Sequence, residues 1–136
     1  MKDKVFIDTN VLVYYFQKKD EPKKIIARRL INDYIDNIVI STQILGELFN
    51  VLKKSGNTSK KSTEIIKECL VSFEVISIEP YIVSQALYIH ERYEYSYYDS
   101  QVIFAALYSY CKILYTEDLH HNQLIEKKLR IINPFK

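Results

Sequence analysis

Short apolar runs alternate along the chain with longer stretches in which apolar residues recur every three or four positions. The runs are rich in valine and isoleucine, as are strands that are buried on both faces of a parallel sheet. They lie at residues 4–7, 37–40, 73–78, 112–115 and 130–132. Such alternation of strands and helices predicts a mostly parallel sheet covered by helices, with right-handed crossovers.

The stretches between the runs predict helices at residues 22–35, 42–54, 62–70, 80–92 and 97–110. The helix at 42–54 has an apolar face made of Ile44, Leu45, Leu48 and Leu52. Ser41 is a suitable N-cap for it, and Gly56 fits just past its C-terminus. The polar residues 55–61 connect it to the next helix, and the two form a helical hairpin. This polar stretch is therefore not a domain boundary, and residues 1–136 are predicted to form a single domain.

Length and composition support one folded domain. The chain has 136 residues, of which 48% are hydrophobic, and this is enough to bury a core. Its 19 basic and 17 acidic residues give a formal net charge of +2, which does not by itself indicate nucleic-acid binding. No apolar run approaches the roughly 20 residues of a membrane span, and the charged start of the chain does not resemble a signal peptide. A cytoplasmic protein is expected.

Several kinds of site are not indicated by the sequence. Cys69 and Cys111 form no CxxC motif and have no histidine at ligand spacing, so buried free thiols are expected. The adjacent His120 and His121 would diverge on any regular element, which favours surface positions over a metal site. With only two glycines, the chain has neither a GxGxxG motif nor a P-loop. Any phosphate chemistry would therefore depend on a metal ion.

Four acidic residues stand where strands end or helices begin. Asp8 and Asp118 follow apolar runs, Glu47 lies one turn into the helix after Ser41, and Asp99 lies in the first turn of another helix. The carboxyl ends of parallel strands meet at one edge of a sheet, so these residues should converge there. Clustered carboxylates suit a hard cation such as Mg²⁺. The pattern predicts a metal-dependent enzyme that acts on phosphates.

Each acidic residue also has a structural interpretation. Asp8 and Asp118 could form turns or helix caps, and Glu47 could be a solvated helical glutamate. Asp99 could complete a capping box with Ser96. An aspartyl-phosphate mechanism is disfavoured because Asn10 stands where the pattern Asp-x-Asp requires a second acid.

The helical spacing around Asp99 favours a functional position. Asp99 begins a helix face that should point to the protein interior. This face continues through Val102, Ile103, Ala106 and Tyr110. An acid at the start of an apolar face is directed inward, where it can join the other carboxylates.

Four segments in a characteristic order carry these acids. They are Val5-Phe6-Ile7-Asp8-Thr9-Asn10, Ile40-Ser41-Thr42-Gln43-Ile44-Leu45-Gly46-Glu47-Leu48, Ser96-Tyr97-Tyr98-Asp99-Ser100 followed by Ile103-Phe104-Ala105-Ala106, and Leu114-Tyr115-Thr116-Glu117-Asp118-Leu119. Together with the closing Ile131-Ile132-Asn133-Pro134-Phe135, they resemble the motifs of PIN-domain ribonucleases of the VapC toxin type. The resemblance covers nearly the whole chain.

The resemblance implies a three-layer α/β fold with a mostly parallel five-stranded sheet of order 3-2-1-4-5. It further implies that Asp8, Glu47, Asp99 and Asp118 hold Mg²⁺ or Mn²⁺, with Asn10 and Thr116 supporting them through hydrogen bonds. The implied activity is hydrolysis of phosphodiester bonds in RNA. The implied partners are a cognate antitoxin that blocks the active site and a second copy of the chain in a homodimer.

A phosphate-responsive or protein-binding α/β domain without catalytic activity, such as a receiver, is the alternative. A receiver needs paired acids at the end of the first strand and a lysine after the last strand. The first strand of this chain ends in Asp8 followed by Thr9 and Asn10, and Arg130 precedes its strand. The enzyme hypothesis therefore fits the sequence better.

Overall fold

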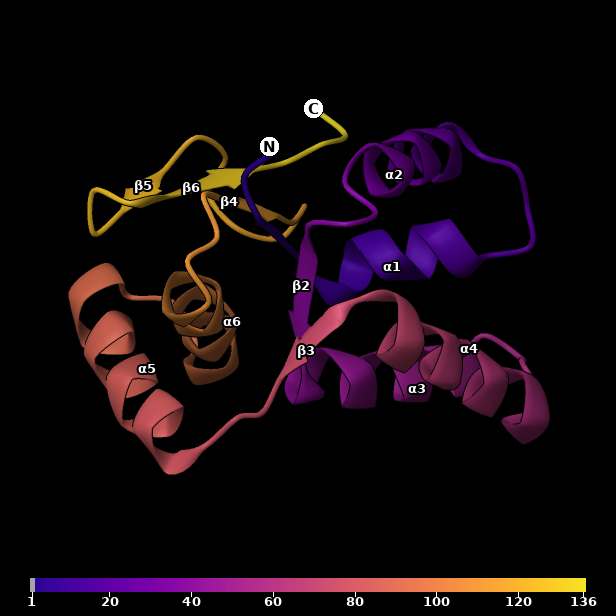
Figure 1. Ribbon diagram of the computed structural model, residues 1–136, viewed down its shortest axis with the longest axis horizontal. Helices are drawn as coiled ribbons and strands as arrows, with labels where there is room; N and C mark the ends of the chain where they lie inside the picture. The colour runs from indigo at the N-terminus through magenta and orange to yellow at the C-terminus, as the bar shows by residue number, and fades with distance from the viewer. Residues whose placement is uncertain (1) are drawn as a thin grey trace.

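The computed structural model describes residues 2–136, which fold around one twisted sheet (Figure 1). The sheet has six strands in the order β3-β2-β1-β4-β6-β5. The strands are β1 (Val5–Ile7), β2 (Ile38–Ser41), β3 (Glu74–Ile76), β4 (Ile113–Tyr115), β5 (Leu124–Ile125) and β6 (Leu129–Ile132). All neighbouring pairs are parallel except β5 with β6, which are antiparallel.

The predicted fold class is confirmed, with one additional strand. The predicted order 3-2-1-4-5 appears as β3-β2-β1-β4-β6, and β5 adds an antiparallel edge that the sequence did not predict. β5 has only two residues, too few to show an alternating pattern. It is joined to β6 by a tight turn in which Glu126 and Lys127 have positive φ angles. The prediction of five strands is therefore wrong by one short edge strand.

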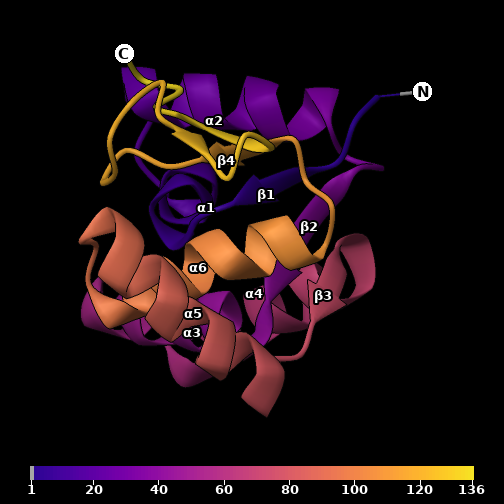
Figure 2. The same ribbon diagram turned by 90° about the vertical axis from the view of Figure 1, so that its left-hand side faces the viewer.

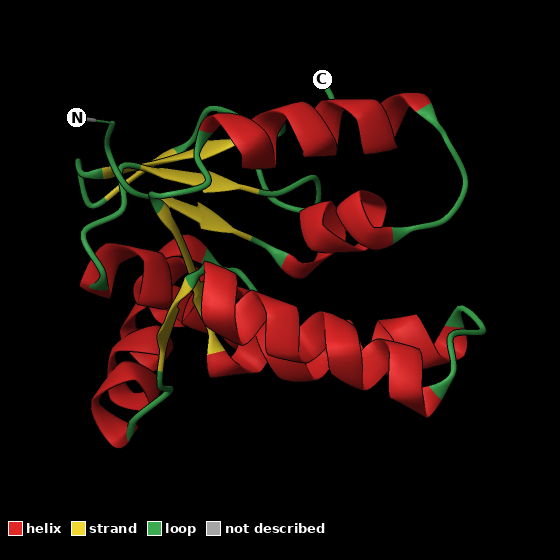
Figure 3. Ribbon diagram, turned by 45° about the vertical axis from the view of Figure 1, so that its right-hand side comes forward, coloured by secondary structure: helices red, strands yellow, loops and turns green. Residues whose placement is uncertain are grey.

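Helices cover both faces of the sheet. They are α1 (Thr9–Phe16), α2 (Pro22–Asp33), α3 (Thr42–Lys54), α4 (Ser59–Ser72), α5 (Pro80–Tyr93) and α6 (Tyr97–Tyr108). The pair α5 and α6 packs on one face, in front of the sheet in Figure 2, whereas α1 to α4 lie on the other. The connection between α1 and α2 and the one between α3 and α4 lie at the same end of the molecule (Figure 3).

One helix was not predicted, and several helix boundaries differ from the prediction. Helix α1 was not predicted because Val11 to Phe16 are all apolar or aromatic and show no helical period. Helix α4 begins at Ser59, earlier than expected, because the Thr58 side chain caps it by accepting from the Lys61 N–H. Helix α6 ends at Tyr108, and Tyr110 is exposed with a φ of 64°. Tyr110 is therefore not on the inward face that includes Asp99.

The core is continuous across the central strands. All three residues of β1 are completely buried, which explains why this strand is an unbroken apolar run. Cys69 and Cys111 are buried free thiols, as predicted. Burial raises the pKa of Cys69 to about 12 and that of Cys111 to about 11, so both are weak nucleophiles and weak metal ligands near neutral pH. None of the helices in residues 2–136 is long and apolar enough to cross a membrane.

The two glycines provide a matched test of the helical hairpin. Gly56 follows α3 with a φ of 95°, whereas Gly46 lies inside α3, and a Cβ at either position would meet no atom within 4 Å. Gly56→Ala should lower the free energy of unfolding by about 1 to 2 kcal/mol because L residues disfavour this backbone conformation. Gly46→Ala should raise it by about 0.5 to 1 kcal/mol because alanine favours a helix.

Urea unfolding of the wild type and both variants measures the two effects. Neither substitution changes contacts in the folded state, so any difference reports backbone conformation. Equal shifts in the same direction would show that Gly56 is not needed to end α3.

Candidate active site

All four predicted acidic residues line one cleft of about 530 Å³. Asp8 and Asp118 follow β1 and β4, the two central parallel strands, while Glu47 and Asp99 come from α3 and α6. The remaining lining residues are Thr9, Asn10, Val13, Tyr14, Gln43, Asn50, Val51, Val102 and Glu117. The predicted convergence at the carboxyl edge of the sheet is therefore observed as a shared cleft.

Asp8 is the most constrained of the four. It follows β1 directly and is only 8% exposed. Its Oδ1 accepts from the Thr9 N–H at 2.8 Å, which caps α1, and its Oδ2 accepts from the Thr116 hydroxyl at 2.8 Å. The capping interpretation is thus correct, but it accounts for only one of the two carboxylate oxygens.

The environment of Asp8 opposes its ionisation. Burial is the largest effect and raises the pKa of the carboxyl from 3.8 to about 7. Hydrogen bonds from Thr116 and Thr9 lower the pKa and partly offset burial, whereas the charges of Glu47 and Asp118 raise it further. A buried acid beside other acids gains stability as an anion when a cation binds next to it.

Asn10 and Thr116 connect the carboxylates of Asp8 and Asp118. The Asn10 amide donates to Asp118 Oδ2 at 2.9 Å and to the Thr116 hydroxyl at 3.2 Å. Its carbonyl oxygen accepts from the Glu117 N–H at 3.3 Å, and the Asp118 N–H donates to Thr116 at 3.2 Å. These bonds bind the loop after β4 to the start of α1 and orient both acids.

Glu47 is half-buried and hydrogen-bonded, not a freely solvated glutamate. Its Oε1 accepts from the Thr9 hydroxyl at 2.9 Å, and its Oε2 accepts from the Gln43 amide at 3.4 Å. Gln43 in turn accepts from Gln101 at 2.6 Å, and Gln101 accepts from Tyr97 at 2.7 Å. Sequence reasoning did not select Gln43, although it precedes Glu47 by one turn on the same polar stripe.

Asp99 lies in the first turn of α6, where the Ser96 side chain accepts from its N–H at 3.2 Å. Only this half of the expected capping box forms. Within residues 2–136 no donor contacts the Asp99 carboxylate, which lines the cleft. Asp99 is therefore available to a ligand in a way that the hydrogen-bonded Asp8, Glu47 and Asp118 are not.

The donor set fits a hard divalent cation. Four carboxylates in one cleft are the ligands that Mg²⁺ and Mn²⁺ prefer. Among residues 2–136, however, no three carboxylate, imidazole or thiol side chains already stand close enough together to hold an ion. Binding a cation therefore requires carboxylates to approach one another.

The structural neighbours of the chain include a toxin and toxin–antitoxin complexes. A toxin–antitoxin complex from Klebsiella pneumoniae has a TM-score of 0.74 at 18% identity and covers 96% of this chain and 98% of its own. VapC20 of Mycobacterium tuberculosis, a toxin that cleaves the sarcin–ricin loop, has a TM-score of 0.72 at 17% identity, with coverages of 85% and 92%. DNA-bound VapBC from Salmonella typhimurium has a TM-score of 0.67 at 19% identity, with coverages of 96% and 97%. At these identities the likeness establishes the fold.

Comparison with curated proteins found no match in sequence. The sequence profile of the PIN domain, by contrast, matches residues 5–127, which include β1 with Asp8 and the loop after β4 with Asp118. The matched region thus contains all four acidic residues of the cleft. The chain belongs to the PIN-domain family, and its fold is that of the VapC toxins.

Proposed function

We propose that this protein is a Mg²⁺- or Mn²⁺-dependent ribonuclease that acts as the toxin of a toxin–antitoxin pair. The observation that carries the proposal is the meeting of Asp8, Glu47, Asp99 and Asp118 in one cleft of a PIN fold. The acids come from four separate segments of the chain, and structural capping alone gives no reason for all four to share a cleft.

In the proposed site, Asp8 and Asp99 hold the cation, while Glu47 and Asp118 complete its shell or orient the attacking water. When bound, the cation polarises the scissile phosphate and lowers the pKa of a water molecule. The protein supplies orientation. Thr9 and Gln43 hold Glu47, and Asn10 holds Asp118. Thr116 donates to Asp8, which keeps one carboxylate oxygen fixed at the end of β1.

The proposed partners follow from the neighbours. Several are complexes of a toxin with an antitoxin, so we propose a cognate antitoxin that covers the cleft in the cytoplasm. A homodimer that places two clefts side by side is part of the same proposal. The substrate class is RNA. Its scissile phosphate would be bound through the metal ion, because no glycine lines the cleft in the described part of the chain.

The receiver alternative gains no support from the site. The basic residue near the last strand, Arg130, is exposed in β6 and donates to the Asn122 carbonyl at 2.7 Å. It does not line the cleft.

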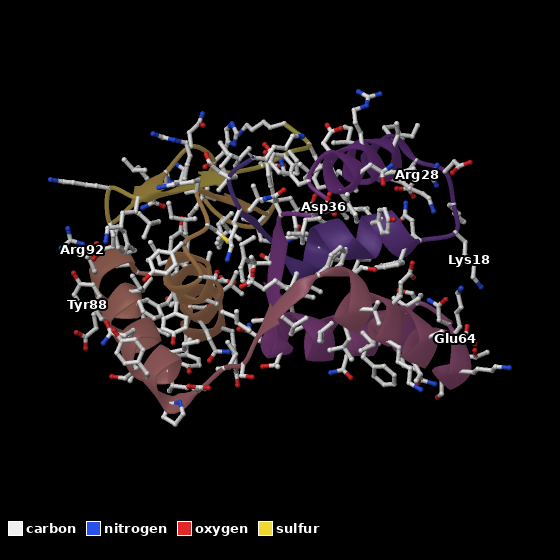
Figure 4. The ribbon with its side chains drawn as sticks, in the orientation of Figure 1. Lys18, Arg28, Asp36, Glu64, Tyr88 and Arg92 are labelled. Carbon is white, nitrogen blue, oxygen red and sulfur yellow. The ribbon has the colours of Figure 1, made fainter. Side chains whose placement is uncertain are left out.

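Removal of one proposed ligand should abolish activity. Asp99→Asn should reduce cleavage of RNA by at least about a hundredfold, because it removes a metal-binding charge from a carboxylate that no donor within residues 2–136 contacts. Asp36→Asn is the matched control, since Asp36, labelled in Figure 4, is exposed and is not among the residues that line the cleft. Cleavage is measured with purified protein and labelled RNA at fixed Mn²⁺. Activity of folded Asp99→Asn equal to that of the control would remove Asp99 from the site.

The stability of the metal-free protein should depend on Asp8. Because the folded-state pKa of about 7 lies above the ordinary 3.8, the folded state binds more protons between these values. In EDTA the wild type should therefore lose stability as the pH rises from about 4 to about 8, on the order of a few kcal/mol. Asp8→Asn cannot ionise, so its stability should change less over this range. Urea unfolding at several pH values measures the difference between the two proteins.

Mn²⁺ should stabilise the wild type more than it stabilises Asp8→Asn. At pH 8, a hundredfold excess of Mn²⁺ over its Kd should stabilise the wild type by about 2.7 kcal/mol and should stabilise Asp8→Asn much less. If Asp8 only caps α1, the two proteins should respond equally to Mn²⁺. Thermal melts at constant ionic strength, with and without Mn²⁺, distinguish these cases.

A further inference from the structure

The cleft is strongly acidic, and this is a difficulty for an RNA-binding site. Five carboxylates line it, those of the four proposed ligands and that of Glu117, and none of its lining residues within the described part of the chain is lysine or arginine. One divalent cation leaves a net negative charge there if most of these groups are ionised. A phosphate of RNA would then be repelled unless a protein cation lies close to the cleft.

Lys23 contacts the cleft wall. Its Nζ donates to Glu117 Oε2 at 2.8 Å and to the Tyr14 hydroxyl at 3.3 Å. Tyr14 donates to Glu117 Oε1 at 2.8 Å, and both Tyr14 and Glu117 line the cleft. The ammonium group of Lys23 is thus one hydrogen bond behind the cleft wall, beside the residue that precedes Asp118.

Two aromatic rings hold the lysine side chain in this position. Its Nζ lies 5.1 Å from the ring centroid of Tyr14 and 5.5 Å from that of Phe135. The two rings pack edge to face with centroids 5.1 Å apart. The ammonium group is therefore held beside the cleft wall by residues of α1, the loop after β4 and the C-terminal segment.

The ion pair between Lys23 and Glu117 can break easily, so Lys23 can change its anionic partner. The side chain of Lys23 is 45% exposed and that of Glu117 is 20% exposed. Pairs with this much exposure contribute little to stability because water and salt screen them, so breaking this one costs little. Lysine has a flexible stem and a compact charge, which allow it to turn toward a new anion. Glu117 would retain its hydrogen bond from Tyr14 when Lys23 leaves.

We propose that Lys23 binds a phosphate of the RNA substrate, and that Glu117 and Tyr14 hold its ammonium group beside the cleft wall until RNA enters. This inference rests on the ribonuclease function proposed above. In the free protein Glu117 balances the charge of Lys23. In the complex an RNA phosphate replaces Glu117 as its partner. Lys23 is a binding residue, so its loss should weaken binding more than it slows the chemical step.

The first test removes the charge and retains the stem. Lys23→Met should weaken binding of a labelled single-stranded RNA by about tenfold, measured by fluorescence anisotropy in the cleavage-deficient Asp99→Asn background at fixed Mg²⁺. The slope of log Kobs against log salt concentration should become shallower by about 0.7, as expected for one lost phosphate contact. With Asp99 intact, KM should rise while kcat stays within about twofold. Lys23→Arg should restore most of the affinity because it restores the charge.

Arg28→Met is the matched control. Arg28 is an exposed basic residue on the same helix, labelled in Figure 4, and it does not line the cleft. Arg28→Met removes the same charge from α2. The affinity of this variant for RNA, and the slope of log Kobs against log salt concentration, should remain close to those of the parent protein. Thermal melts of Lys23→Met and Arg28→Met check that both variants are folded.

A double-mutant cycle tests the exchange of partners. Glu117→Gln should tighten RNA binding by about threefold when Lys23 is present, since the phosphate no longer competes with a carboxylate for the ammonium group. In the Lys23→Met background the same substitution should have little effect. An equal gain in both backgrounds would show that Glu117 acts only through its charge in the cleft, and would overturn the exchange.

The outcomes separate this inference from the ribonuclease proposal. If the wild type cleaves RNA and Lys23→Met binds it as tightly as Arg28→Met does, Lys23 merely docks α2 against the loop after β4, and only the present inference fails. If neither the wild type nor any variant binds or cleaves RNA, the ribonuclease proposal fails and this inference fails with it.

Discussion

The organisation of the cleft depends on the burial of one carboxyl group, that of Asp8, beside other acids. β1 is one of the two central strands and is completely buried, so the residue that follows it emerges at the middle of the carboxyl edge with little access to water. Removing a carboxyl from water favours its neutral form, and the nearby Glu47 and Asp118 add to this effect. The hydrogen bonds from Thr9 and Thr116 reduce the penalty but do not remove it.

Neutral side chains donate hydrogen bonds to the carboxylates that lie near the buried Asp8. On one side, Asn10 and Thr116 supply donors to Asp118 and Asp8. On the other side, Thr9 and Gln43 supply donors to Glu47. All four residues are neutral, so they orient the carboxylates without neutralising them. The negative charge is left for cations that are not part of the cleft lining, namely the proposed metal ion and the ammonium group of Lys23.

The fold contributes the meeting of the four acids at one edge of the sheet. Parallel strands with right-handed crossovers bring the ends of β1 and β4 together, and α3 and α6 approach the same edge from opposite faces. Each helix begins with a side-chain cap, Ser41 for α3 and Ser96 for α6, that sets where its first turn lies. Local capping signals therefore determine where Glu47 and Asp99 enter the cleft.

The sequence alone predicted the fold class, the four acidic residues of the cleft and the approximate positions of most elements. These depend on local patterns: buried strands as apolar runs, helices with periodic faces, and caps such as Ser41. Where a local pattern was absent, the prediction failed. Helix α1 lacks an amphipathic period, and β5 is too short to show one.

Only the tertiary structure decided which side chains share the cleft and how they are held. The contacts of Asn10 with Asp118, Gln101 with Gln43, and Lys23 with Glu117 join residues separated by 108, 58 and 94 positions. No local period encodes such contacts, because they arise when separate elements pack on one sheet. The raised pKa of Asp8 is of the same kind, since it results from burial and from neighbours that come together only in the folded chain.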